Sequence, residues 1–285
     1  MSIVAQRPTR PTRWPLRLIW LAIIAIVVFA FWKIQINWSS LADFPSQLWK
    51  YLGLMFAPPD VSTVGQSLSA TLLSVQMAWL GTVLGIIVSF PLSFLAARGV
   101  APVVIRLPMR LIFAVIRAVP EVVIAVLMLS ITGLTPFTGA LALAIGSVGT
   151  LGKWGYEAYE NTEPGPIEAV RAVGGSRWQV VRWGLWPQVS PEVLALWLYR
   201  FEINVRASTI LGLIGAGGIG KLLIDNVQFR IWDAVGMLLI VVIIVTMIID
   251  QISGAIRYRL IYGRWALAGY GQRRALLKRR TLERK

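Results

Sequence analysis

Six long apolar stretches set the strongest constraint on how this 285-residue chain can fold. A helix needs about 20 apolar residues to cross the hydrocarbon core of a bilayer, and each stretch reaches or approaches that length. The composition agrees, because 56% of the residues are hydrophobic and only 14% are charged. We therefore predict an all-α polytopic membrane protein with about six transmembrane helices. The predicted spans are residues 16–36, 67–97, 107–131, 136–155, 191–214 and 232–256.

The distribution of lysine and arginine predicts how these helices are oriented. Basic residues are enriched in the cytoplasmic loops of membrane proteins. If both termini lie inside, 21 of the 28 basic residues fall on the cytoplasmic side and 4 on the opposite side. The prediction is therefore N-in and C-in. It gives a basic cytoplasmic N-terminus over 1–15, a transmembrane domain over 16–256 and a basic cytoplasmic tail over 257–285.

The charge and the missing residue types exclude several functions. The net charge is +15, but the basic residues flank apolar runs, so anionic membrane lipid is the expected partner and nucleic acid is not. The chain contains no cysteine and no histidine. Disulfides, imidazole catalysis and His/Cys metal sites are thereby excluded, and no metal or cofactor is expected in the chain itself.

The segment over 37–66 is rich in aromatic residues and carries few charges. We interpret it as a loop that lies along the outer membrane interface, where aromatic side chains are enriched. Contact with a soluble substrate carrier is the alternative interpretation.

Five charged side chains interrupt the predicted third and fifth spans, namely Arg117, Glu121, Arg200, Glu202 and Arg206. Each would cost about 2.5–3.5 kcal/mol near a helix centre on the insertion scale, so none of them is expected to face lipid. Arg117 and Glu121 are spaced i,i+4, as are Glu202 and Arg206. This spacing predicts two ion pairs, each within one helix face.

These charges have two interpretations, which the sequence leaves open. They can brace the helix bundle, or they can line a translocation path. Pro120 is expected to kink its helix and free backbone carbonyls towards a cavity. Three arginines against two glutamates leave one excess positive charge, which suits an anion. The candidate path residues are Arg117, Pro120, Glu121, Arg200, Glu202, Asn204 and Arg206.

The stretch GAGGIGK over 215–221 matches two nucleotide-binding patterns, GxGxxG and the start of a P-loop. Both matches are weak, because Leu222 stands where a P-loop needs Ser or Thr and no βαβ pattern surrounds the stretch. We instead predict that the glycines end the fifth helix and form a flexible turn or gate at the outer face. The predicted outer-gate residues are Gly215, Gly217, Gly218 and Gly220.

One polar stretch, EAVRAVGGSRWQVVRWGLWP over 168–187, stands between the fourth and fifth spans. Residues 168–173 are compatible with a helix, Gly174 and Gly175 break it, and Ser176 can cap a second helix. Two short helices at an angle form a compact knob, which can fit a groove on a partner and transmit its motion. The fifth span is expected to begin after the knob, at Pro191, with Ser190 as its cap.

This stretch resembles the EAA loop of ABC-importer permeases. Together with RAVPEVVIA (117–125) and FEINVRASTILGLIGAGGIG (201–220), it makes the chain similar to the permease subunits of phosphonate-type importers, a family that phosphite importers share. Methionine-type permeases carry similar GAGGIG endings. Val170, Gly184 and Trp186 depart from the usual EAA pattern.

The resemblance implies a type I ABC-importer permease fold in a bacterial inner (cytoplasmic) membrane, crossed several times. It also implies a homodimer, a pair of cytoplasmic ATPases that hold ATP and Mg, and an extracytoplasmic substrate-binding protein. The cytoplasmic coupling loop then covers 156–190. The residues expected to contact the ATPase are Glu168, Ala169, Gly174, Gly175, Arg177, Trp178 and Pro187.

The expected function is alternating-access import of a small phosphorus oxyanion, phosphonate or phosphite, with no enzymatic activity in this chain. A permease for another solute such as methionine is the alternative. An ion channel would give no reason for a rigid cytoplasmic knob. A membrane-bound enzyme lacks a convincing constellation, since Glu157, Glu160 and Glu163 are interpreted as a solvated face.

Overall fold

A computed structural model describes residues 14–34, 38–56 and 58–263. Within these ranges the chain forms helices and turns and no β-strand, which confirms the predicted all-α class. Most of the predicted N-terminal segment 1–15 and the tail beyond Gly263 lie outside the described residues. The elements are α1 (Trp14–Lys33), α2 (Trp38–Phe56), η1 (Val61–Thr63), α3 (Val64–Ala96), α4 (Val103–Ala118), α5 (Glu121–Thr132), α6 (Pro136–Glu160), α7 (Pro164–Ala172), α8 (Arg177–Gln179), η2 (Val180–Leu185), α9 (Trp186–Leu211), η3 (Gly212–Ala216), α10 (Gly218–Gln228) and α11 (Trp232–Tyr262).

The chain divides into a unit over 1–53 and a unit over 54–285, and each is described by itself. The first unit contains α1, an apolar helix long enough to span a membrane, and most of α2. The helix α2 corrects the prediction of a loop over 37–66. Leu41, Phe44 and Leu48 recur at helical spacing, so a one-sided helix accounts for this apolar segment better than a loop does.

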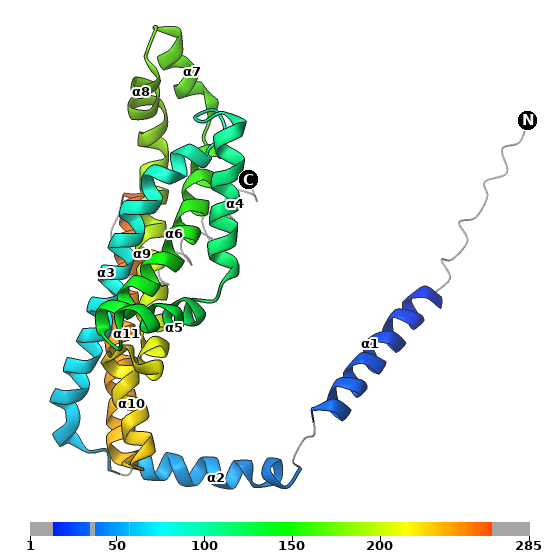
Figure 1. Ribbon diagram of the computed structural model, residues 1–285, viewed down its shortest axis with the longest axis vertical. Helices are drawn as coiled ribbons and strands as arrows, with labels where there is room; N and C mark the ends of the chain where they lie inside the picture. The colour runs from blue at the N-terminus through cyan, green and yellow to red at the C-terminus, as the bar shows by residue number, and fades with distance from the viewer. Residues whose placement is uncertain (1–13, 35–37, 57, 264–285) are drawn as a thin grey trace, which may run out of the picture. The chain divides into compact units, whose positions relative to one another are not determined.

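In the second unit, α3, α6, α9 and α11 run alongside one another (Figure 1). The helices α3 and α6 approach closely because α3 presents glycine to α6. A methyl group at Gly81 would lie 2.7 Å from Leu143 Cβ, and one at Gly85 would lie 2.5 Å from Ser147 Cβ. No larger residue fits there, so the small residues fix which faces of the two helices meet.

The predicted third span is broken into α4 and α5, whose axes differ by 87°. The break falls at Val119 and Pro120. Proline has no backbone N–H and disfavours the helical conformation of the residue before it. The predicted kink at Pro120 is therefore confirmed, although it is a complete break between two helices.

The predicted fourth span corresponds to α6, which begins at a Thr135 cap and extends to Glu160. Its glycines are buried against other helices: a methyl group at Gly152 would lie on the Phe113 ring of α4. By length and hydropathy, the described residues contain three spanning helices, α1, α3 with η1, and α11, or up to five if each of two bent pairs counts as one span. A sixth span through α6 stays a prediction.

The predicted start of the fifth span is wrong. The helix α9 begins at Trp186 with Pro187 in its first turn, and Pro191 lies inside it. A proline in the first turn costs little because that turn has unpaired N–H groups in any case. Pro187, and not Pro191, takes this position.

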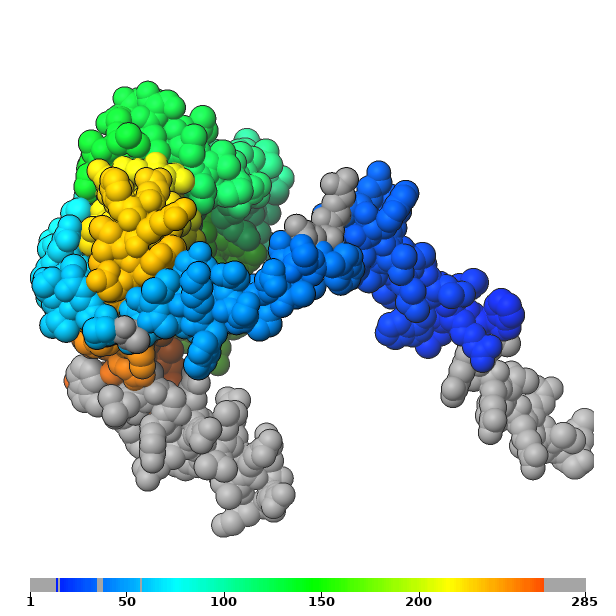
Figure 2. Space-filling view, turned by 90° about the horizontal axis from the view of Figure 1, so that it is seen from below, coloured from blue at the N-terminus to red at the C-terminus, as the bar shows by residue number. Residues whose placement is uncertain are grey.

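The helices α7 and α8 lie at one end of the second unit and α10 lies towards the other (Figure 1). Figure 2 shows the α10 end, where α10 (yellow) and the beginning of α3 (cyan) are next to each other. The break between α9 and α10 bends this pair by 56°. The helix formed by α9 and η3 thus ends at the glycines, as predicted, and α10 continues from them in a new direction.

Candidate functional site

The predicted two-helix knob is present between α6 and α9. The first helix, α7, is followed by Gly174 at a φ of +80°, a conformation that L side chains rarely adopt. Ser176 then caps the second helix in a capping box: its Oγ accepts the Gln179 N–H at 3.4 Å, and Gln179 Oε1 accepts the Ser176 N–H at 2.7 Å. The predicted helix, break and cap are all confirmed.

The second helix of the knob is continuous with α9 through the π-helical segment η2. Gly184 packs against the first helix, since a methyl group there would lie 3.1 Å from Ile167 Cα. The Gln188 side-chain N–H donates to the Gly184 carbonyl at 2.6 Å. The knob is therefore the end of a long membrane helix, and a displacement of the knob must act directly on α9.

The outer surface of the knob is apolar and exposed. Trp178 is 70% exposed, Trp183 63% and Val173 84%. Large aromatic residues on a rigid surface are typical of protein interfaces. The predicted ATPase-contact residues Glu168, Ala169, Gly174, Arg177, Trp178 and Pro187 are exposed, and Gly175 is half-buried.

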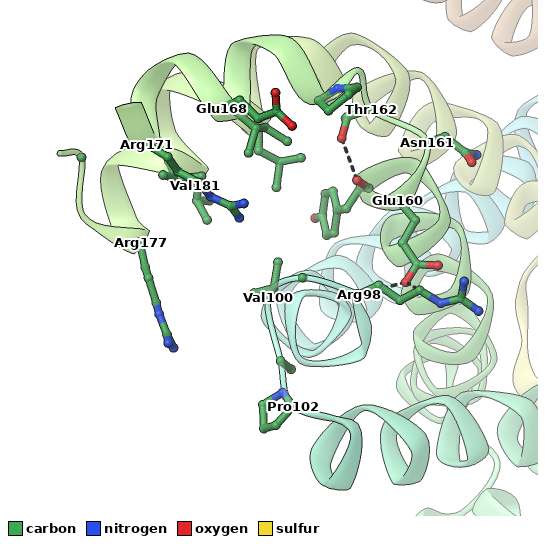
Figure 3. Close-up of a pocket in the computed structure, with 18 residues that line it drawn as sticks. Arg98, Val100, Pro102, Glu160, Asn161, Thr162, Glu168, Arg171, Arg177 and Val181 are labelled. Atoms are coloured by element: carbon green, nitrogen blue, oxygen red, sulfur yellow. Dashed lines mark hydrogen bonds and ion pairs between the residues drawn. The ribbon is translucent and has the colours of Figure 1, made fainter. Parts of the chain in front are cut away.

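A groove of about 1080 Å³ separates the knob from the turn that joins α3 to α4 (Figure 3). Its wall on the knob side includes Glu168, Arg171 and Arg177, and its opposite wall includes Arg98 and Pro102. One side of α7 therefore faces the groove and is not covered by the α3–α4 turn. Sequence reasoning did not anticipate this groove, because it depends on how the two turns pack.

The charges inside the membrane pair between helices, and the predicted i,i+4 pairs are wrong. Arg200 on α9 is buried, forms an ion pair with Glu121 at the start of α5, and donates through Nε to Ser147 Oγ at 2.9 Å. Pro120 separates Arg117 and Glu121 into different helices, so they do not share a helix face.

Glu202 and Arg206, the second predicted pair, do not pair with each other. Glu202 pairs with Arg257 at 2.8 Å and Arg206 pairs with Asp250 at 3.4 Å. Both of these partners lie on α11. Sequence reasoning missed both partners on α11. Asp250 carried a usable signal, since it is an acidic residue within the apolar run over 232–256.

Asn204 joins three helices at the same buried region. Its side-chain N–H groups donate to Thr82 Oγ1 on α3 at 2.8 Å and to Ser147 Oγ on α6 at 3.0 Å. Its Oδ1 has no hydrogen-bond partner among the described residues. The structure thus brings Glu121, Arg200 and Asn204 together near Ser147, and their role in a translocation path stays a prediction.

Arg117 stands apart from this cluster. It lies in the last turn of α4, its side chain is exposed, and it forms no ion pair with any residue that the structure describes. Arg200 and Arg206, the other two arginines of the candidate path residues, each have a carboxylate partner. Asp250, which the predicted count of charges left out, balances Arg206, so Arg117 is the one arginine of this set without a carboxylate partner among the described residues.

The glycine turn between α9 and α10 is confirmed as a turn, and it is packed on several sides. The Ile219 N–H donates to Ser74 Oγ on α3 at 2.9 Å. A methyl group at Gly217 would lie 3.2 Å from Pro136 Cγ, and one at Gly215 would lie 2.6 Å from Leu134 Cδ2. Its role as an outer gate stays a prediction.

Replacing Gly218 by Ala should lower the unfolding temperature of the detergent-purified protein, because the methyl group would overlap the Ser74 hydroxyl and φ is +67°. The expected loss is about 2 kcal/mol, in the range of backbone strain plus overpacking. Gly133→Ala is the matched control, with a similar φ of +77° and open space around its Cβ. Equal losses in the two variants would show that the contact with Ser74 contributes nothing.

The described residues contain no group of three or more His, Cys, Asp or Glu side chains placed to hold a metal ion. The chemistry that the arrangement offers is electrostatic. It consists of three features: the unpaired Arg117 at the helix break, the buried polar cluster of Glu121, Arg200 and Asn204, and the exposed knob at one end of α9.

Comparison with known proteins gives a family match over residues 89–262, described as "Binding-protein-dependent transport system inner membrane component". The phosphate-import permease protein PhnE of Mycolicibacterium smegmatis is 41% identical over 72% of this chain, and the match covers 39% of that longer protein, less than two thirds of it. The phosphite transport system permease protein PtxC of Stutzerimonas stutzeri is 33% identical over 70% of this chain and 73% of its own length.

Two solved structures share the fold. A crystal structure of an amino acid ABC transporter with histidines aligns at a TM-score of 0.60 and 20% identity, over 70% of this chain and 96% of that one. An inward-facing structure of the MetNI methionine ABC transporter aligns at 0.60 and 20% identity, over 66% and 93%. The predicted type I importer fold is thereby confirmed.

Proposed function

The chain belongs to the family of binding-protein-dependent transport system inner membrane components, and on this premise we propose that it imports a small phosphorus oxyanion, phosphonate or phosphite, as a permease subunit. It is a multi-pass protein of the bacterial inner membrane. Relatives named for phosphate and phosphite transport support this substrate class. The methionine transporter shares only the fold, at 20% identity, and does not support methionine as the substrate.

The observation that carries the substrate class is the unpaired Arg117. A guanidinium within a membrane span is costly unless it faces water or a counter-ion. Its planar set of donors matches the oxygens of a phosphorus oxyanion. Arg117 also lies beside the Pro120 break between α4 and α5. A passing oxyanion would supply the counter-charge that the chain does not provide.

ATP hydrolysis is assigned to a pair of partner ATPases that hold ATP and Mg, with the knob as their contact. The exposed Trp178 and Trp183 supply the apolar surface, and the rigid junction to α9 supplies the means of transmission. An extracytoplasmic binding protein delivers the substrate. The proposed glycine gate around Gly217 and Gly218 lies between α9 and α10, away from the knob.

A second copy of the chain is the proposed partner within the membrane. Arg206 on α9 and Asp250 on α11 form an ion pair whose side chains remain 50% and 40% exposed. Such a pair is not expected to face lipid. A two-fold symmetric dimer would cover this face of both copies, and it would present two knobs to two ATPases.

The test is ligand-stimulated ATPase activity and uptake in proteoliposomes that contain the chain, its ATPase and its binding protein. Phosphite or a phosphonate should stimulate both, and methionine should stimulate neither. Stimulation by methionine alone would contradict the substrate class. The mass of the purified complex should show that it contains two copies of this chain. A requirement for a different permease subunit would contradict the homodimer.

Replacing Gly174 by Val should uncouple the same complex. A β-branched residue resists the φ of +80° at this position, and left-handed backbone costs an L residue about 1–2 kcal/mol, so substrate moved per ATP should fall about fivefold or more. Gly165→Val in α7 is the control, since both positions have open space around Cβ and only Gly174 has a positive φ. Equal coupling in the two variants would count against a rigid knob.

A further inference from the structure

We propose that Glu160 is a positioning residue that ties the coupling knob to α4, so that movement of the knob turns α4 and displaces Arg117. This inference rests on the proposed function, because it explains how a partner's ATP cycle reaches the substrate. Sequence reasoning placed Glu160 on a solvated face. The structure corrects this, because the carboxylate turns inward to two other elements.

One oxygen of Glu160 connects three parts of the chain. Its Oε1 accepts the backbone N–H of Arg98 at 2.6 Å, just after the end of α3 (Figure 3). The same oxygen forms an ion pair with the guanidinium of Arg110 on α4. The Glu160 and Arg110 side chains are only 18% and 22% exposed, so water screens this pair little.

Arg110 extends the connection on both sides. Its Nε donates to the Ala96 carbonyl at the end of α3 at 2.9 Å, and its guanidinium lies 4.3 Å from the centre of the Tyr156 ring on α6. The guanidinium of Arg98 lies 3.9 Å from Glu160 and is 70% exposed, so it adds little. The ion pair between Glu160 and Arg110 is therefore the main charged link between α4 and α6.

The position of Glu160 in the chain makes this link a route for motion. It is the last residue of α6, and only residues 161–163 separate it from α7. The knob therefore pulls on Glu160 over a short, hydrogen-bonded connection, in which the Thr162 hydroxyl donates to the Tyr159 carbonyl at 2.9 Å.

The far end of α4 carries the proposed substrate contact. The helix has 16 residues, about 24 Å at the usual rise, and Arg117 lies in its last turn. Beyond the Pro120 break, α5 is held by the ion pair of Glu121 with Arg200. The ion pair with Glu160 holds α4 near its middle, at Arg110, about two turns before Arg117. A rigid α4 that turns about this link moves Arg117 relative to the fixed cluster.

A double-mutant cycle tests the link in the reconstituted complex, with substrate transported per ATP as the readout. Glu160→Gln and Arg110→Gln should each lower this ratio about fivefold, and the double variant should be no worse than either single one, as residues that act as one unit behave. Losses that multiply in the double variant would overturn the proposal, as would unchanged coupling in both single variants.

Glu157→Gln is the matched control, because Glu157 lies one turn earlier on α6 and pairs with Lys153 at 3.3 Å on the surface. It should couple as the unmodified chain does. If the unmodified complex shows no ATP-driven uptake of any phosphorus oxyanion, the proposed function fails. If it shows uptake and Glu160→Gln is equally coupled, only the positioning role fails.

A spin label distinguishes the loss of this link from a general loss of folding. The chain has no cysteine, so Val115→Cys on α4, at an exposed position, accepts a single label. Its spectrum should change when nucleotide binds the complex, and this change should disappear in Glu160→Gln while persisting in Glu157→Gln. A response that survives Glu160→Gln would contradict the proposed lever.

Discussion

Replacing Arg117 by Gln is expected to lower uptake of phosphite or phosphonate at least about tenfold, because a hydrogen bond to a charged group contributes about 1.5–3 kcal/mol. Basal ATPase activity should persist, and its stimulation by substrate should be lost. Arg117 has no carboxylate partner in the described chain, so its removal leaves no buried charge unpaired. The variant should insert and unfold like the unmodified protein.

Two variants make this result specific. Arg117→Lys keeps the charge but loses the planar donor set, so we expect partial uptake with a weaker apparent affinity. Arg106→Gln removes a charge from the same helix nearer its first turn and should leave uptake unchanged. Normal transport by Arg117→Gln would refute the proposed oxyanion contact, whatever the behaviour of the other two.

Replacing Arg200 by Gln should destabilise the protein by about 3 kcal/mol, since breaking a buried ion pair leaves an uncompensated charge. The guanidinium is buried, binds Glu121 and also donates to Ser147, so three helices lose a common contact. Thermal unfolding in detergent measures the effect. Glu121→Gln should have a similar effect, because it leaves the guanidinium of Arg200 buried without a counter-charge.

The double variant separates charge from packing. Glu121→Gln combined with Arg200→Gln removes both charges, and the double loss should be smaller than the two single losses added together. Lys153→Gln is the control for a surface pair, expected to cost less than about 1 kcal/mol. Strictly additive losses would mean that the two residues do not form a pair in the membrane.

The coupling knob could be predicted from the sequence because its geometry is local. Gly174 supplies the positive φ, and Ser176 and Gln179 close a capping box over four residues. None of these features depends on what the rest of the chain does. The start of α9 does not follow from the sequence in the same way, because Pro187 and Pro191 both satisfy the rule for a first-turn proline, and the structure has Pro187 there.

The ion pairs could not be predicted because their partners are remote. Arg200 and Glu121 are 79 residues apart, and Arg206 and Asp250 are 44 apart. Spacing within one helix favoured nearer partners. The Pro120 break removed one such pair, and the packing of α11 against α9 offered better carboxylate and guanidinium partners for Glu202 and Arg206.

The sequence by itself determined the helical class, the apolar segments, the break at Pro120 and the form of the knob. These follow from hydropathy and from interactions over a few residues. Only the tertiary structure decided that Arg117 has no carboxylate partner among the described residues and that Glu160 contacts α4. Both depend on which helix faces meet, and glycine contacts such as those of Gly81 and Gly85 fix those faces in three dimensions.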